Sequence, residues 1–170
     1  DAHIAPHTIK IASMFSVMSR LQSSQKCDIL TKMKIYNGED VIEKGRVKKI
    51  DIKDLREEST NSEGMSGVST RFIMKAIYSA LSASEKNMIT PNSVMESLIK
   101  QVKEQVISEE DRDIYLEILQ KIIREEYLKI LENEIAKAFV AAYEEQAQSL
   151  FDSYLDNAEC YTNRTTVKDR

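Results

Sequence analysis

The chain of 170 residues is long enough for one domain or two small ones, and its 42% hydrophobic residues provide a core that argues against disorder. Only 4 glycines, 2 prolines and no tryptophan are present, which favours helices over turn-rich sandwiches and barrels. The mild net charge of −4 excludes a strongly basic chain, so no nucleic-acid partner is expected.

Two helices are predicted in the first 38 residues. Pro6 is suited to a first helical turn, where its missing N–H costs nothing. Apolar residues then recur at steps of three and four along one helical face: Ile11, Met14, Phe15, Met18 and Leu21. Asp28 is expected to cap a second, shorter helix, which Gly38 ends.

The segment between residues 39 and 58 carries the weakest helical signal. Residues 41–50 are compatible with one short β-hairpin around Gly45 and about equally with a loop. Residues 51–58 are predicted to form a short helix with Ile52 and Leu55 turned inward.

The remaining helices are predicted from their caps. Ser69 is a suitable N-cap, Thr90 is followed by Pro91 at a first helical position, and Ser108 precedes a strongly acidic first turn that the helix dipole favours. After Ser108 the sequence has no Gly or Pro, and an apolar stripe persists for about twelve turns. We expect either one very long helix or two helices that break near residues 131–134.

The stretch EGMSGVSTR, residues 63–71, is the most distinctive in the chain. Arg71 falls on the first turn of a predicted helix, where a cation opposes the helix dipole and gains little locally. It is therefore a candidate ligand for an anion such as phosphate, which the free N–H groups of a helix start also attract. The loop residues assigned to this candidate site are Gly64, Ser66, Gly67 and Ser69, and its glycines would let the backbone approach a ligand closely. The alternative is a surface arginine that pairs with Glu63 or with water.

Three other patterns favour a structural interpretation. His3 and His7 have a spacing that suits zinc, but no third ligand lies nearby. The glutamate pairs at 125–126 and 144–145 lack the histidine of di-iron helix motifs. The tyrosines of the last predicted helix fit a core or an interface better than a platform for stacking bases. No metal site is predicted.

The chain also lacks the motifs of a complete catalytic site. No phosphate-binding GxxxxGK[ST] loop, no kinase HRD or DFG motif and no GxSxG nucleophile motif occurs. No apolar run approaches the roughly 18 residues of a membrane span, so no membrane partner is expected. Cys27 and Cys160, far apart in sequence, fit a reducing, cytoplasmic location. Because the chain starts without Met and ends in a polar stretch, we interpret it as an inactive piece of a longer protein.

Six stretches, in order along the chain, resemble the bacterial PrkA family, whose members are described as serine protein kinases built on an AAA+ ATPase module: residues 4–21, 32–39, 63–77, 108–119, 124–139 and 153–161. The resemblance implies that residues 1–105 form the helical lid side of that module and that residues 106–170 begin the PrkA C-terminal domain. It also implies that the Walker motifs lie upstream, and that ATP and Mg²⁺ are bound by the whole protein rather than by this piece alone.

In AAA+ lids an arginine at the start of a lid helix, the sensor-2 arginine, reaches the nucleotide phosphates, and Arg71 occupies the matching position. The family often has Pro where this chain has Thr70, which makes the helix start less rigid. Residues that would carry out phosphoryl transfer are not identifiable.

Residues and resemblance together predict an all-α fold, a small lid-like bundle followed by long helices. The expected function is that of a nucleotide-sensing lid and regulatory helical region in a PrkA-type ATP-dependent serine protein kinase, partnered by the remainder of the AAA+ module. The alternative is a non-catalytic helical module for protein interaction or homo-oligomerisation.

Overall fold

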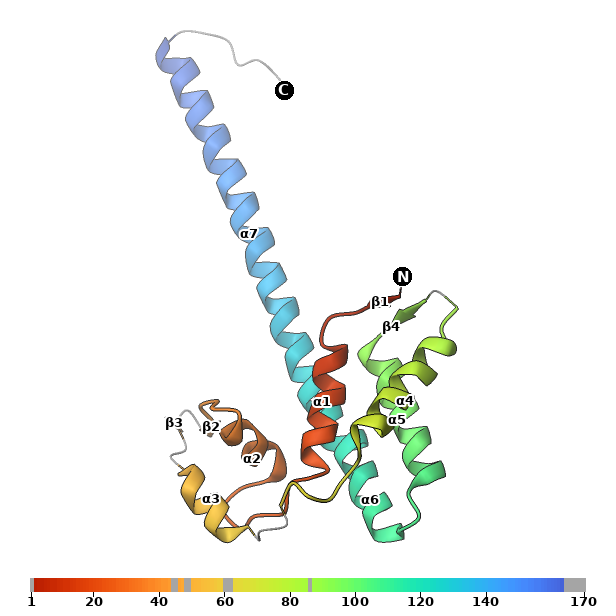
Figure 1. Ribbon diagram of the computed structural model, residues 1–170. Coiled ribbons are helices and arrows are strands. Elements are labelled where there is room, and N and C mark those ends of the chain that lie inside the picture. The colour runs from red at the N-terminus through yellow and green to blue at the C-terminus, as the bar shows by residue number, and fades with distance from the viewer. Residues whose placement is uncertain (1, 44–45, 48–49, 60–62, 86, 164–170) are drawn as a thin grey trace. The chain divides into compact units, whose positions relative to one another are not determined.

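The computed structural model describes residues 2–43, 46–47, 50–59, 63–85 and 87–163, which form two compact units, residues 1–126 and 127–170 (Figure 1). The described residues are mostly helical, with two pairs of two-residue strands, which confirms the predicted all-α class. The family resemblance divides the chain by function, between residues 105 and 106. That division stays a prediction.

The first unit contains most of the secondary structure. In chain order its elements are β1 (His3–Ile4), α1 (Thr8–Met18), α2 (Ile29–Tyr36), β2 (Ile42–Glu43), β3 (Arg46–Val47), α3 (Ile52–Glu58), α4 (Thr70–Ser82), β4 (Met88–Ile89), α5 (Pro91–Gln105), α6 (Glu109–Glu117) and the π-helix η1 (Ile118–Ile123). Helix α7 (Arg124–Asn163) begins at the end of this unit and makes up the described part of the second.

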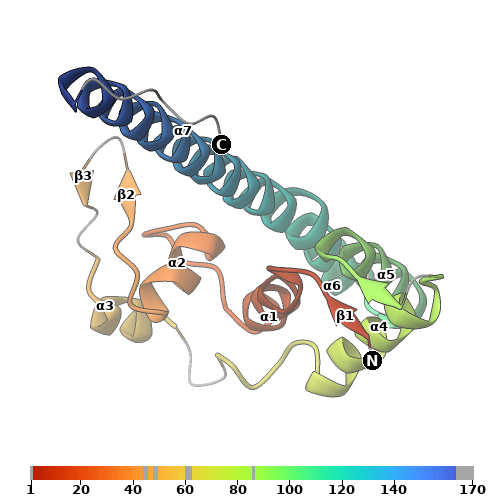
Figure 2. The same ribbon diagram turned by 90° about the horizontal axis from the view of Figure 1, so that it is seen from above.

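The core of the first unit forms around α1. This helix packs against α5 and η1, and more lightly against α2 and α4, so it lies between the α2–α3 side and the α4–α6 side (Figure 2). Its predicted apolar face is buried except for Leu21, which lies beyond the end of α1 and is half-buried. The fully buried ring of Phe15 meets Tyr115 edge-on with centroids 5.9 Å apart. The buried core residues of the neighbouring elements include Leu55, Ile73, Ala76, Val94, Leu98, Val102, Leu119 and Ile123.

Side-chain caps set the predicted helix starts. Asp28, Ser69 and Ser108 each accept a hydrogen bond from a backbone N–H in the first turn of α2, α4 and α6. Thr90 forms a reciprocal capping box with Ser93, and Pro91 follows it at the first position of α5. These four predicted N-caps are confirmed.

One of the two short strand pairs joins distant segments, and the other is a local hairpin. Strand β1 pairs with β4 in parallel, which ties the start of the chain to the start of α5. Strands β2 and β3 are antiparallel, with Ile42 opposite Val47, so the hairpin alternative for residues 41–50 is confirmed. Residues 44–45 and 48–49 of that prediction lie outside the described residues.

Helix α3 is confirmed with one difference in its buried face. Leu55 is fully buried, but Ile52 is 36% exposed rather than turned inward. Helix α3 has seven residues and packs mainly against α2, so it places only one side chain in the core.

The last predicted segment is irregular at a point that the sequence pattern did not indicate. Of the two predicted alternatives, the break at residues 131–134 is absent, because α7 runs as regular α-helix through them. The irregularity lies earlier, in η1, where the backbone forms a π-helix and Ile118, Leu119 and Ile123 are buried. A π-turn holds more residues than an α-turn, so it shifts which side chains face the core.

Candidate functional site

Helix α4 presents Arg71 on an exposed first turn. The Ser69 hydroxyl oxygen accepts from the backbone N–H of Phe72 at 3.2 Å and so fixes the helix start. Arg71 itself is exposed, and among the described residues no ion pair involves it. The expected alternative partner, Glu63, pairs with Lys32 instead. The guanidinium and the positive end of the helix dipole therefore lie together at the surface.

The Glu63–Ser69 loop packs against the end of α1. The Gly64 N–H donates to the Arg20 carbonyl oxygen at 3.0 Å, and the Arg20 guanidinium donates to the carbonyl oxygens of Gly64 and Val68 at 3.4 and 2.9 Å. The Val68 N–H donates to Ser19 Oγ at 3.2 Å. Hydrogen bonds to Ser19 and Arg20 thus hold both halves of the loop, and this keeps the start of α4 in place.

The two glycines of this loop meet different surroundings. Both have positive φ, +85° at Gly64 and +112° at Gly67, a region that favours glycine. A Cβ on Gly67 would lie 2.5 Å from the carbonyl oxygen of Ser19, whereas one on Gly64 would meet nothing within 4 Å. We expected Gly67 to let the backbone approach a ligand closely. In the structure it is the chain's own backbone that lies close to Gly67. Ser66, between the two glycines, is exposed.

A buried ion pair anchors the start of the loop. The Lys32 side chain is 1% exposed, and its ammonium donates to Glu63, to Ser59 Oγ at 2.8 Å and to the Gln22 carbonyl oxygen at 3.1 Å. Glu63 also accepts from the Tyr36 hydroxyl at 3.0 Å and from the Gln22 N–H at 2.9 Å. Since both charges have several partners, the pair joins α2 and the α1–α2 connection to the loop that leads to Arg71.

The surroundings of Glu63 also set its pKa. Burial alone would raise the pKa of this carboxyl, but the Lys32 ammonium, the Gln22 N–H and the hydroxyls of Ser59 and Tyr36 outweigh it and lower the pKa below its usual value. Burial and the bond to Glu63 raise the pKa of Tyr36, so its hydroxyl stays a donor at neutral pH.

Glu63→Gln is expected to destabilise the first unit by about 1–3 kcal/mol at neutral pH, because the charge is lost while one acceptor oxygen remains. A lowered folded-state pKa gives stability that is present above the unfolded-state pKa and is lost as the pH falls through the folded value. The difference between wild type and Glu63→Gln should therefore shrink as the pH falls below the ordinary carboxyl value of 4.5. Thermal unfolding at a series of pH values measures it, and a difference that grows toward acid pH would contradict the ion pair.

Helix α4 is held along its length by α5. The Ser97 hydroxyl donates to the Ala76 carbonyl oxygen at 2.8 Å, and the buried Gln101 amide donates to the Phe72 carbonyl oxygen at 2.8 Å. The two helices also pack against each other, and each buries apolar side chains, among them Ala76 on α4 and Leu98 on α5. Arg71 is thus carried by a two-helix element with both polar and apolar links.

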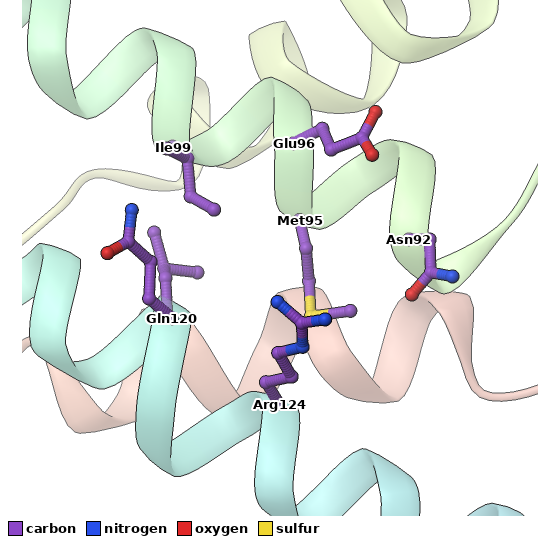
Figure 3. Close-up of a pocket in the computed structure, with 7 residues that line it drawn as sticks. Asn92, Met95, Glu96, Ile99, Gln120 and Arg124 are labelled. Atoms are coloured by element: carbon purple, nitrogen blue, oxygen red, sulfur yellow. The ribbon is translucent and has the colours of Figure 1, made fainter.

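A second candidate site is a cavity of about 500 Å³ between α5 and η1. Figure 3 shows Arg124 reaching from the start of α7 toward Met95, with Gln120 beneath Ile99. The remaining lining residues are Asn92, Glu96 and Leu119. This cavity contains none of the residues that the sequence singled out, and no sequence motif pointed to it.

The other sequence-predicted patterns are separated by the fold. His3 lies in β1, whereas His7 precedes α1 in the left-handed region with φ of 65°, so the two do not share a helix face. No group of three or more His, Cys, Asp or Glu residues that could hold a metal occurs within the described ranges. Glu126 of the glutamate pairs forms an ion pair with Lys34. None of the helices in the described part of the chain combines the length and hydrophobicity that a bilayer span requires.

These observations define an all-α protein whose candidate site is an exposed arginine at a firmly held helix start. The sequence matches the family described as PrkA serine protein kinase C-terminal domain over residues 30–170, and the chain belongs to this family. This bears out the family resemblance noted in the sequence.

Two relatives show how far the similarity extends. The chain is 40% identical over 176 residues to the ATP-dependent protease PrkA of Bacillus subtilis (strain 168), and 28% identical over 169 residues to the serine/threonine kinase YeaG of Escherichia coli (strain K12). Each comparison covers 99% of this chain but 26% of the relative, so the chain spans about a quarter of their length. No solved structure matches the chain.

Proposed function

We propose that this chain is the nucleotide-sensing lid and regulatory helical region of a larger PrkA-type ATP-dependent enzyme. The single observation that carries the proposal is Arg71, an exposed guanidinium at the N-terminal end of α4. A cation at that end has no favourable local charge to meet, whereas a phosphate there would interact with both the guanidinium and the helix dipole. The loop that leads to it is bonded to α1, which orients the side chain's helix before any ligand binds.

The residues fit the phosphates of ATP better than they fit its metal ion. Arg71 and the N–H groups of the first turn of α4 supply donors for phosphate oxygens. The described residues offer no acidic cluster for Mg²⁺. In this proposal the remainder of the AAA+ module holds Mg²⁺ and the base of the nucleotide, and the lid contributes a positive charge to the phosphates.

The names of the relatives differ in the reaction that they state. One is named as an ATP-dependent protease and the other as a serine/threonine kinase. Sensing of a bound nucleotide is compatible with either activity, because it concerns the state of ATP rather than the group that is cut or modified. We therefore propose nucleotide sensing for this chain and assign the catalysed reaction to the rest of the protein.

Arg71→Ala in the full-length protein is expected to lower the rate of ATP hydrolysis by about tenfold, because the transition state would no longer be stabilised by this one positive charge. A steady-state assay with ATP and Mg²⁺ measures it. Lys75→Ala is the matched control, because Lys75 is also an exposed cation on α4, one turn further from the helix start. Wild-type turnover in Arg71→Ala, or an equal loss in Lys75→Ala, would remove the proposed role.

A second candidate function is that of a helical interaction module. The observation that favours it is the large number of exposed apolar side chains on α7, among them Phe139, Tyr143 and Leu150. This function does not exclude the first, because it concerns a different unit of the chain.

A further inference from the structure

Helix α7 exposes an unusual amount of apolar surface along the second unit. Every residue from 132 to 159 is exposed. Six large side chains in this range are between 57% and 74% exposed: Phe139, Val140, Tyr143, Leu150, Phe151 and Tyr154. A solvated helix this long would be rich in charged residues on all faces, so one face of α7 is suited to a partner.

Many of the exposed apolar residues follow an 11-residue period, although Ile135 and Leu155 do not. We call the residues that follow it the α7 stripe: Ala136, Ala147 and Ala158; Phe139, Leu150 and Tyr161; Val140 and Phe151; Tyr143 and Tyr154. Eleven residues in three turns is 3.67 residues per turn, close to the 3.6 of an α-helix. The stripe therefore runs nearly straight along the helix, as in long helices that pack against another helix.

Seven of the ten stripe residues are also symmetric about Ala147, whereas Phe139, Leu150 and Tyr161 have no counterpart in the stripe. Counting outward from that residue, Tyr143 corresponds to Phe151, Val140 to Tyr154, and Ala136 to Ala158. Interfaces between two identical chains related by a two-fold axis require a surface that complements itself in this way. An antiparallel pair centred on Ala147 would set small residues against small ones and rings against rings or Val140.

The acidic residues of this segment lie mostly off the α7 stripe. Between residues 138 and 163 the chain has no Lys or Arg and five acidic residues: Glu144, Glu145, Asp152, Asp156 and Glu159. At about 100° per residue, Glu145, Asp152, Asp156 and Glu159 fall on the side of α7 away from Ala147, so they do not oppose the close approach of two stripes.

The area also suits a dimer. Aromatic side chains bury about 150–250 Å² each, so the rings of Phe139, Tyr143, Phe151 and Tyr154 alone would remove roughly 600–1,000 Å² per copy when fully buried. That is near the roughly 800 Å² that each partner contributes to a stable interface. We propose that the α7 stripe is the docking surface for a second copy of this chain, which pairs through α7 in the antiparallel direction.

The mass of the 170-residue chain in solution tests the proposal. Sedimentation equilibrium at about 10–100 μM is expected to give twice the single-chain mass of 19.5 kDa. Phe151→Glu, on the stripe, should raise the dimer dissociation constant at least about tenfold. Ala141→Glu adds the same charge to an exposed position off the stripe and should leave it within about twofold. A single-chain mass for the wild type, or equal effects of the two variants, would overturn the proposal.

Cysteine cross-linking tests the direction without relying on a variant that weakens the dimer. In a Cys27→Ala and Cys160→Ala background, chains with Ala136→Cys and chains with Ala158→Cys are mixed and oxidised. The antiparallel pair should give a disulfide-linked dimer from the mixture and little from either variant alone. A dimer that Ala136→Cys forms efficiently by itself indicates the parallel direction and contradicts the proposed arrangement.

Discussion

Replacing Lys32 by methionine is expected to lower the free energy of unfolding of the first unit by about 3–5 kcal/mol. The Lys32 side chain is 1% exposed, and its ammonium has three oxygen partners that would all lose a donor. Glu63, at 12% exposure, would be left with its negative charge and only neutral donors. Urea unfolding followed by circular dichroism measures the loss.

The chain offers a matched control for this effect. Lys26 pairs with Asp54 at 3.1 Å, but both side chains are about half exposed. Lys26→Met should cost at most about 1 kcal/mol, since water solvates both charges in the absence of the pair. In the double variant Lys32→Met and Glu63→Met the loss should be smaller than the sum of the two single losses, because no unpaired charge remains buried. A Lys32→Met loss no larger than that of Lys26→Met would show that the buried pair is not a major contributor.

Gly67→Ala is the second large expected change, about 2–4 kcal/mol in the free energy of unfolding. The added Cβ would lie 2.5 Å from the Ser19 carbonyl oxygen and 2.7 Å from Arg20 Cγ. Backbone must shift to relieve the first contact, and that shift would strain the bonds from Ser19 and Arg20 to the loop.

The Gly64→Ala variant separates the energetic cost of steric crowding from the cost of the backbone conformation. Gly64 also has positive φ, but a Cβ there meets nothing within 4 Å. Its cost should be about 1 kcal/mol, the value for placing a side chain in the left-handed region alone. Chemical denaturation of both variants provides the comparison, and equal costs would mean that the close approach to Ser19 is relaxed at little expense.

The parts of the fold that depend on neighbouring residues were predictable from sequence. Caps such as Ser69 and Thr90 act within three residues of a helix start, so their residue types predict where α4 and α5 begin. The apolar face of α1 was likewise visible as a period. The π-helix η1 was not, because its six residues carry no local signal that distinguishes a wide turn from an α-turn.

The candidate site was predictable only in part, for a related reason. The helix start and the exposure of Arg71 follow from nearby residues. The partners of the loop do not, because Lys32 lies 31 residues from Glu63 in sequence, and Ser19 lies 49 residues from Val68. A single lysine in an amphipathic helix is usually solvated, so nothing in the sequence indicated that Lys32 would be buried. The 11-residue period of α7 was also hidden, because its 3.67 residues per turn are hard to distinguish from the 3.6 of an α-helix over a few turns.

The bonds from Ser97 and Gln101 to α4 carry a mechanical consequence. Sliding α4 along α5 by one turn would strip the buried Gln101 amide of its acceptor, at a cost comparable to any single contact with a nucleotide. The two helices are therefore expected to move as one rigid body. In the nucleotide-sensing role proposed for Arg71, a displacement of α4 would therefore be passed to α5.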